Sequence, residues 1–206
     1  GPRKIDALMN ELMINYVPYS NNEEMYYKIR DRELSGNKIK DTARFIYLNK
    51  SCFNGLYRVN KSGKFNVPFG KKKNTMVLDP KNLNACMEAL KNTKLLCGDF
   101  YKTMKYIEKN DLVYLDPPYA PLSKTSDFTD YTDKGFNQFD QMRLKNYCDE
   151  ITKKGAKFIL NNSDVPFINE LYNEYNVMHI SISRAISAKK ESRVKVGEVI
   201  ITNYGL

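Results

Sequence analysis

Apolar residues recur at helical spacing through the first fifty positions of the chain. This period predicts amphipathic helices over residues 4–13, 21–35 and 39–51. Pro18 follows the first of them, and it closes that region because proline donates no backbone hydrogen bond. Asparagine opens the second, and Gly36 lies just beyond its end, as is typical of helix boundaries.

The pattern then changes to short alternating runs. Two such runs flank the segment "NKSG" and predict a β-hairpin over residues 57–67. Residues 71–79 are expected to form a loop. Asp79 and Pro80 have the character of an N-cap and a first-turn proline, and they predict a helix that runs to about Leu90.

From residue 94 onward, short apolar runs alternate with amphipathic stretches. The runs predict strands over residues 94–100, 112–116, 157–164, 177–187 and 198–204, and the stretches predict helices over residues 101–110, 138–154 and 165–175. Such alternation indicates an α/β fold with a largely parallel sheet that is covered on both faces. The mostly helical part with the hairpin is then an insertion into that fold.

Composition restricts the class of protein. At 206 residues the chain is long enough for one ordinary domain with a small appended subdomain. Its 42% hydrophobic and 12% aromatic content exclude wholesale disorder. No run reaches the roughly 18 apolar residues of a membrane helix, and no signal peptide is visible, so we expect a cytoplasmic protein. The net charge of +9 favours a polyanionic partner, nucleic acid above all.

The cysteines and the single histidine do not indicate a metal-binding or catalytic role. None of the four cysteines belongs to a C-x-x-C pair; they are Cys52, Cys86, Cys97 and Cys148. We therefore expect neither a zinc site nor a disulfide framework, and we expect the thiols to be reduced. His179 lies in an apolar strand-like run, where a structural role is the expected one. The sequence thus predicts no metal site.

The stretch "DLVYLDPPYA", residues 111–120, takes an apolar run directly into an acid, two prolines and a tyrosine. Pro117 cannot donate to a sheet ladder and biases Asp116 towards extended backbone. Together with Pro118 it stiffens the turn, so that Tyr119 is held at a fixed angle beside Asp116. The stretch therefore predicts a rigid group of an acid, a carbonyl and an aromatic ring.

Functional groups of parallel α/β sheets gather at the carboxyl ends of the strands. The predicted strands that end in polar residues do so at Asp99, at Asp116 and at Asn161 to Asp164. A carboxylate, a bare carbonyl and a flat aromatic wall suit the exocyclic amine of a nucleobase. The Asp116 carboxylate and the Pro117 carbonyl would each accept one N–H, and both bonds strengthen as the amine becomes tetrahedral and positive. Tyr119 would stack on a base extruded from the duplex.

D-P-P-Y after an apolar strand is the catalytic motif of amino-methyltransferases that act on DNA. The chain resembles specifically the Dam-type DNA adenine-N6 methyltransferases of the D12 class. The resemblance rests on "NGLYRVNKSGKFNVPFG", on "GDF" before the motif, and on "APLS", "FTDYT" and "EVIITNY" after it. It implies a Rossmann-like, S-adenosylmethionine-dependent catalytic domain, residues 1–20 and 92–206, and a helical and hairpin DNA target-recognition subdomain, residues 21–91.

The resemblance also implies roles for single residues. The implied catalytic residues are Asp116, Pro117, Pro118 and Tyr119, which would hold the flipped adenine while S-adenosylmethionine delivers its methyl group. Asp99 and Phe100 would contact the adenine ring of the cofactor, and Asp116 would line the same site. Independently of the family, Asp99 is also a candidate helix N-cap.

The DNA-binding residues that the resemblance implies are Phe53, Asn54, Leu56, Arg58, Pro68, Lys71, Lys72 and Arg193. Arg58 matches the arginine that contacts a guanine in the major groove, an interaction worth roughly 1 to 3 kcal/mol. Phe53 and Asn54 match the pair that enters the base stack, while Leu56 and Pro68 match apolar contacts to base edges. The implied site in double-stranded DNA is GATC. Without the family, Arg58 is an ordinary surface residue, and the lysines form a solvated loop.

One part of the family pattern has no counterpart here. Relatives begin with a strand that runs into F-x-G-x-G and wraps the methionine end of the cofactor, whereas the ten glycines of this chain include no G-x-G. The sheet would therefore lack its first strands. We expect a second chain or an amino-terminal segment to complete the cofactor site.

Other functions stay open at this point. A catalytically silent DNA-binding fragment or subunit would use the hairpin and the positive charge, but it would not need the complete D-P-P-Y. Methylation of another amine, such as cytosine N4, is a third candidate, although enzymes of that kind often carry Ser or Asn in place of Asp116. The biological role, whether restriction protection, repair marking or phage modification, is not specified by the residues.

Overall fold

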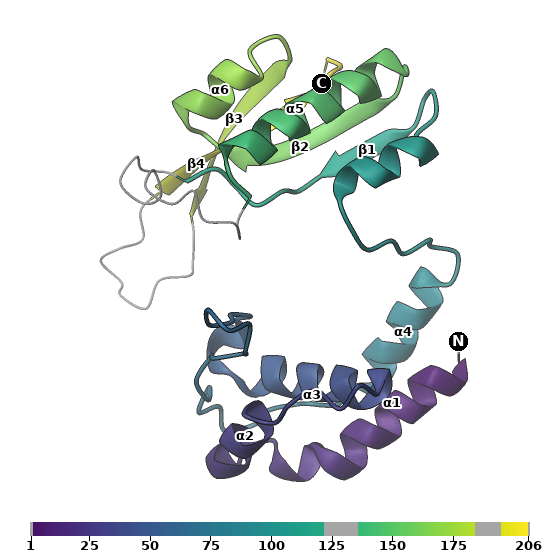
Figure 1. The fold of residues 1–206 in the computed structure, drawn as a ribbon, viewed down its shortest axis with the longest axis vertical. Helices are drawn as coiled ribbons and strands as arrows, with labels where there is room; N and C mark the ends of the chain where they lie inside the picture. Colours follow the sequence, from purple (N-terminus) through teal and green to yellow (C-terminus); the bar gives the residue numbers. More distant parts are fainter. Residues whose placement is uncertain (1, 122–135, 184–194, 206) are drawn as a thin grey trace. The chain divides into compact units, whose positions relative to one another are not determined.

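The computed structural model describes residues 2–121, 136–183 and 195–205 (Figure 1). The chain divides into two compact units, residues 1–95 and residues 96–206. The expected grouping of residues 1–20 with the sheet domain differs from this division, because Leu12 and Tyr16 are buried in the core of the first unit.

Helices dominate the first unit. They are α1 (Pro2–Asn15), η1 (Val17–Tyr19), α2 (Glu23–Arg30), α3 (Lys38–Ser51), η2 (Phe53–Gly55) and α4 (Pro80–Leu90). Side-chain caps explain where three of them begin, since Asn22, Asn37 and Asp79 each accept a hydrogen bond from a backbone N–H in the first turn. The predicted first and third helices and the predicted helix from Pro80 to Leu90 are confirmed.

The predicted second helix is shorter than expected, because α2 ends at Arg30. Arg44 of α3 explains the early end. Its Nε donates to Ile29 O (3.0 Å), and its Nη2 donates to Arg30 O (2.7 Å) and Arg32 O (2.9 Å). These bonds satisfy carbonyls that a further helical turn would otherwise have to satisfy.

The core of the first unit is rich in tyrosine. Tyr47 lies between Tyr16 and Tyr26, with ring centroids 5.3 Å and 6.2 Å away, and none of the three is more than 6% exposed. Tyr26 donates to Val67 O (2.8 Å) and Tyr47 donates to Tyr19 O (3.1 Å). Burial raises the pKa of Tyr47 to about 12. The bond to Val67 ties the hairpin segment to the helices.

The first unit contains a β-hairpin where the alternating pattern predicts one. Val59 and Phe65 form an antiparallel bridge, and Asn60 N donates to Lys64 O (2.9 Å). Gly63 in the turn has a φ of +76°, a conformation that glycine adopts without steric cost. The hairpin is thus confirmed, although its arms pair at an isolated bridge rather than along a continuous ladder.

The second unit is built on a mixed sheet. Its elements are η3 (Phe100–Tyr106), β1 (Leu112–Leu115), α5 (Gln138–Lys153), β2 (Lys157–Ser163), α6 (Pro166–Leu171), β3 (Asn176–Ser183) and β4 (Lys195–Thr202). The strand order is β1-β2-β4-β3; β1 and β2 pair in parallel, and β4 pairs antiparallel with both of its neighbours. The α/β class is confirmed. The expectation of a largely parallel sheet is wrong for the described residues, because the consecutive strands β3 and β4 pair directly with each other.

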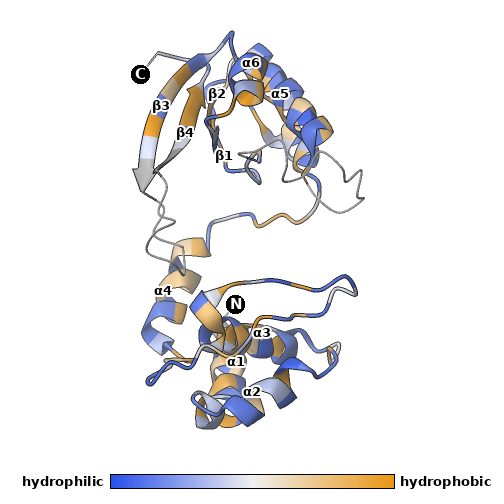
Figure 2. Ribbon diagram, turned by 90° about the vertical axis from the view of Figure 1, so that its left-hand side faces the viewer, coloured by the Kyte–Doolittle hydropathy of each residue, from blue (hydrophilic) through white to orange (hydrophobic). Residues whose placement is uncertain are grey.

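One face of this sheet carries the core of the second unit. Phe158 and Leu160 of β2 pack with Ile151 of α5, and all three are fully buried. Side chains alternate between the two faces of a strand, and the apolar stretches of β3 and β4 are visible in Figure 2. On the opposite face, Leu112 and Tyr114 of β1 are 61% and 62% exposed. The expectation of a sheet covered on both faces is therefore wrong for β1.

Two further predictions are corrected at the edges of the second unit. Residues 94–100 form no strand, and Leu95 and Leu96 are 74% and 51% exposed. An apolar run becomes a strand only when a neighbour accepts its backbone hydrogen bonds, and none of the described residues forms a β-bridge with this segment. The helix predicted over residues 165–175 is also shorter, because α6 ends at Leu171.

Candidate functional site

The turn from Asp116 to Ala120 follows β1 directly, at the carboxyl end of the strand. Asp116 is exposed, Pro117 and Tyr119 are half-buried, and Ala120 is buried. The two prolines end the strand because neither can donate to the ladder. The structure thus places the predicted carboxylate and ring on one short turn at the rim of the sheet.

A buried pair of amides holds this turn in place. Gln141 of α5 donates to Pro118 O (3.0 Å), and Asn162 of β2 accepts from Ala120 N (2.9 Å). Asn162 also donates to Gln141 Oε1 (3.0 Å), and neither side chain is more than 2% exposed. Buried amides are stable only when their polar atoms are paired. The helix and the neighbouring strand therefore fix the shape of the turn.

The amide clamp, Gln141 with Asn162, leaves two acceptors available. It uses the carbonyl of Pro118 and the N–H of Ala120. Among the described residues, none bonds to the Asp116 carboxylate or to the Pro117 carbonyl. An incoming group with two N–H donors can therefore meet a fixed pair of acceptors here.

Asp99 lies at the start of η3, where its Oδ1 accepts from Tyr101 N (2.9 Å). Arg143 of α5 contacts both carboxylate oxygens through Nη2, at 3.0 Å and 3.1 Å, and this contact lowers the pKa of Asp99 below its ordinary value. Arg143 is itself held by Asp140 (3.2 Å) and lies over the ring of Phe100 (5.2 Å). The predicted pair, Asp99 and Phe100, is thus brought together with a basic residue that the sequence did not single out.

Arg58 is fixed across the hairpin of the first unit. Its Nε donates to Asn66 Oδ1 (2.8 Å) and its Nη2 donates to Asn66 O (3.3 Å). The backbone N–H of Asn66 donates in return to Arg58 O (3.1 Å). One edge of the guanidinium group is therefore used for positioning, while Nη1 has no partner among the described residues.

The turn between α3 and the hairpin exposes apolar side chains. Phe53 and Leu56 are 42% and 43% exposed. Asn54 and Gly55 between them have φ values of 53° and 66°, a left-handed conformation that asparagine and glycine tolerate. Asn49 of α3 donates to Gly55 O (2.7 Å) and braces the turn. The two apolar residues consequently stay at the surface instead of entering the core.

The remaining predicted DNA contacts lie after the hairpin. Pro68 and Lys71 are exposed, and Lys71 has a φ of 51°. Lys72 Nζ donates to Lys50 O at the end of α3 (3.0 Å). The predicted contact residues between positions 53 and 72 thus lie on the surface of the first unit, while Val67 and Phe69 belong to its core. Arg193 lies outside the described residues.

His179 lies on β3 with its Nδ1 2.9 Å from Asp164 Oδ2. Asn169 donates to the same carboxylate (2.8 Å), and these two hydrogen bonds lower the pKa of Asp164. All four cysteines are free. Within the described ranges, no cluster of three or more metal-binding side chains forms. None of the helices in the described part of the chain is long and apolar enough to cross a membrane.

Comparison with protein families covers both segments of the chain at once. The model of the D12 class N6 adenine-specific DNA methyltransferases matches residues 3–186. The chain belongs to this family. Because the match extends through both compact units, the hairpin segment and the D-P-P-Y turn both lie inside it.

Curated relatives of this family member come from archaea and bacteria. The Type II methyltransferase M.MjaIII of Methanocaldococcus jannaschii is 46% identical over 189 residues, which cover 88% of this chain and 65% of that protein. The Type II methyltransferase M1.LlaDCHI of Lactococcus lactis subsp. cremoris is 40% identical, over 95% and 71%. The DNA adenine methylase of Haemophilus influenzae is 36% identical, over 88% and 64%. The chain therefore spans about two thirds of the length of these relatives.

The sequence did not single out the residues that hold the candidate site residues in position. They are Gln141 and Asn162 at the D-P-P-Y turn, Arg143 at Asp99, and Asn66 at Arg58. Only Asn162 gave a signal, as a polar residue at the end of a predicted strand. The others act through contacts between elements, which a linear pattern does not contain.

Proposed function

We propose that this protein transfers a methyl group from S-adenosylmethionine to N6 of an adenine in double-stranded DNA, within the sequence GATC. The observation that carries the proposal is the clamped turn after β1, in which the Asp116 carboxylate and the Pro117 carbonyl accept no hydrogen bond from any residue that the structure describes. Such a protein acts on DNA in the cytoplasm of a bacterial or phage-infected cell.

The turn suits a nucleophile that must be activated without a strong base. Asp116 and Pro117 would each accept one N–H of the target amine. As the nitrogen bonds to the methyl carbon it becomes tetrahedral and positive, so both hydrogen bonds are stronger in the transition state than in the ground state. Tyr119 would stack on the adenine once it has left the duplex. The amide clamp contributes by holding these groups in one geometry before the substrate arrives.

The residues at η3 fit the adenosine part of the cofactor. Asp99 is an ionised acceptor, and a carboxylate offers about four lone-pair positions. Tyr101 N and Arg143 use part of this capacity, and the rest would accept the exocyclic amine of the cofactor. The half-buried ring of Phe100 offers an apolar surface beside it. When bound, S-adenosylmethionine supplies the electrophilic methyl carbon.

The first unit supports selective DNA binding. The guanidinium of Arg58 keeps one N–H of Nη1 and the second N–H of Nη2 for guanine O6 and N7, the arrangement that identifies a G·C pair in the major groove. Phe53 and Leu56 are exposed apolar groups of the kind that enter a base stack or contact base edges. The net charge of +9 adds attraction to phosphates at any sequence.

Methyl incorporation from labelled S-adenosylmethionine tests the proposal. One duplex carries a single GATC, and a matched duplex has the adenine replaced. We expect incorporation into the first duplex alone, and none with the Asp116→Ala variant. Selective binding to GATC without incorporation would support a DNA-binding role in place of the enzymatic one. Equal binding to both a GATC duplex and a scrambled duplex would refute the recognition role of the hairpin.

A further inference from the structure

The hairpin that carries Arg58 has two faces that differ in chemistry. Val59 and Phe65 form its antiparallel bridge, and Asn66 N donates to Arg58 O at the next position along the two arms. Successive side chains of a strand point to opposite faces, and directly opposed residues share a face. Arg58 and Asn66 therefore lie on one face, which is the face proposed to contact DNA. The other face carries Tyr57, Val59 and Phe65.

An aromatic row of Phe45, Tyr57 and Phe65 joins this second face to α3. The ring centroid of Tyr57 lies 5.6 Å from that of Phe45 and 5.8 Å from that of Phe65, with interplanar angles of 56° and 50°. These separations are within the range of favourable aromatic pairs. Phe45 and Tyr57 are both exposed, so their contact lies at the surface and outside the core. The first arm of the hairpin thus rests on α3 through the ring of Tyr57.

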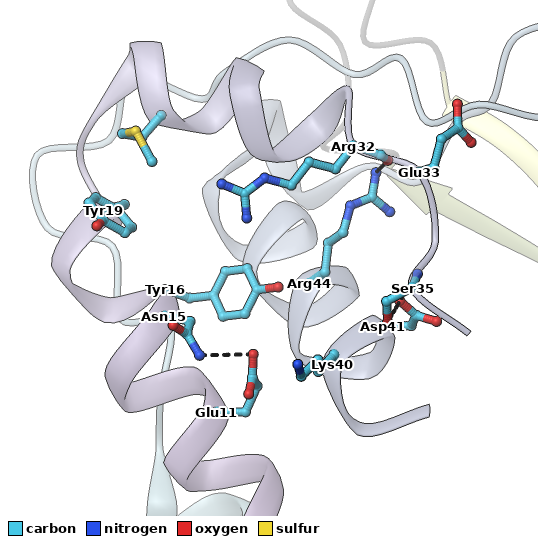
Figure 3. A pocket seen from close by; sticks show the side chains of 11 residues that line it. Glu11, Asn15, Tyr16, Tyr19, Arg32, Glu33, Ser35, Lys40, Asp41 and Arg44 are labelled. Atoms are coloured by element: carbon cyan, nitrogen blue, oxygen red, sulfur yellow. Dashed lines mark hydrogen bonds between the residues drawn. The ribbon is translucent and has the colours of Figure 1, made fainter. Parts of the chain in front are cut away.

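The helix that carries Phe45 is held firmly in the first unit. Arg44, the preceding residue, extends from α3 towards the residues at and after the end of α2 (Figure 3), and it donates to three backbone carbonyls of residues 29–32 at 2.7 to 3.0 Å. Asp41, one turn earlier in α3, accepts from both the backbone N–H and the hydroxyl of Ser35 at 2.8 Å. Phe45 therefore gives the hairpin a fixed point of contact.

The hairpin needs such a contact because its own pairing is short. Its arms meet at an isolated bridge, and a two-stranded hairpin by itself is at best marginally stable in water. The second arm is tied to the core where Tyr26 donates to Val67 O (2.8 Å). Near the turn, Lys64 forms an ion pair with Glu33, but both side chains are exposed and pairs of that kind contribute little. The first arm, which carries Arg58, is joined to α3 by the aromatic row.

We propose that Phe45 is a positioning residue for base recognition: through Tyr57, it sets the direction in which the hairpin presents Arg58 to a guanine. The inference rests on the proposed recognition role of the hairpin. Tyr57 and Arg58 are consecutive residues on opposite faces, so holding the ring of one against α3 fixes the direction of the other. Asn66 orients the guanidinium group within the hairpin, whereas Phe45 orients the hairpin within the unit. A bidentate contact with guanine needs both, because its two hydrogen bonds require one defined plane.

Hydrogen exchange measured by NMR tests the support of the hairpin in the free, intact protein. The backbone N–H groups of Asn60 and Asn66 donate to carbonyls across the hairpin, at 2.9 Å and 3.1 Å. In Phe45→Ala both amides should exchange about fivefold faster, because the hairpin loses an aromatic contact and opens more often. Phe45→Tyr keeps the ring and should restore the wild-type rates. Phe139→Ala is the matched control, since it removes an exposed phenylalanine of α5 in the other unit.

Competition anisotropy with two duplexes tests the effect on recognition. One duplex carries a single GATC, and the other has 7-deazaguanine in place of guanine in that site. Phe45→Ala should lower the ratio of the two affinities about fivefold, and Phe45→Tyr should restore it. Unchanged exchange in Phe45→Ala, or an unchanged ratio, would overturn the inference. Wild-type protein that binds both duplexes equally would refute the recognition role of the hairpin itself, and the inference with it. Neither measurement needs methyl transfer, so both remain decisive where the proposed enzymatic activity fails.

Discussion

Asn66 is predicted to control how well Arg58 discriminates guanine. Its Oδ1 accepts from Arg58 Nε at 2.8 Å, and its carbonyl accepts from Nη2 at 3.3 Å. These bonds fix the plane of a side chain that carries about 2 kcal/mol of rotamer entropy. A guanidinium held in this way loses little further entropy when it binds O6 and N7 of guanine.

The substitution Asn66→Ala removes the side-chain bond and keeps the backbone of the hairpin. If about half of the rotamer entropy of Arg58 returns, the cost is roughly 1 kcal/mol. We therefore expect binding to a GATC duplex to weaken about fivefold. A duplex with 7-deazaguanine lacks the N7 acceptor and cannot form the paired contact, so the same variant should bind it almost as well as wild type does.

Competition anisotropy with the two duplexes measures both affinities in one series. Asn84→Ala is a matched control, since Asn84 is an exposed asparagine on α4 in the same unit. The informative quantity is the ratio of the two affinities, which should fall about fivefold only for Asn66→Ala. An equal loss on both duplexes would refute the positioning role, because it would place the effect of Asn66 on the phosphate backbone or on folding.

Three other outcomes are expected. Asp116→Ala should abolish methyl incorporation and leave duplex affinity unchanged; retained turnover would remove the carboxylate from the proposed mechanism. Asn162→Ala leaves buried partners of the amide clamp unpaired, which should cost about 1–3 kcal/mol of stability in denaturant unfolding, and an unchanged midpoint would contradict the clamp. Arg143→Met should raise the pKa of Asp99 towards its ordinary value of 3.8 in a carboxyl NMR titration. A carboxyl group whose pKa is lower in the folded state than in the unfolded state stabilises the fold at pH values above its unfolded pKa. The difference in free energy of unfolding between wild type and this variant should therefore shrink as the pH falls through the pKa of Asp99.

Local signals predicted where the helices begin, because caps act on the backbone next to them. Asp79 and Pro80 set the start of α4, and the helix runs to Leu90 as predicted. The end of α2 depended instead on Arg44, which takes the carbonyl of Arg30 from 14 positions away. A contact of that kind leaves no trace in the local pattern, so the predicted helix was too long.

The strands also depend on contacts that the local sequence pattern does not contain. Residues 94–100 and 112–116 have similar apolar patterns, yet only the second run contains a strand, because β2 lies beside it. Strand formation is a property of a pair of segments. The pattern of apolar residues identifies a segment that can form a strand. Whether the segment does so depends on a neighbouring strand that pairs with it.

The role of β2 at the candidate site follows from its register. Leu115 is opposite Leu160, so the end of β2 lies beside the turn that follows β1. Successive side chains point to opposite faces: Asn162 turns inward to the Ala120 N–H, whereas Asn161 donates to the Tyr114 hydroxyl on the other face. The sequence pattern predicts both asparagines at the carboxyl end of the strand, but it does not indicate which of them contacts the turn. The register makes Asn162 the support of the turn, so the polar end of β2 acts on the proposed chemistry through the position that it gives to Asp116.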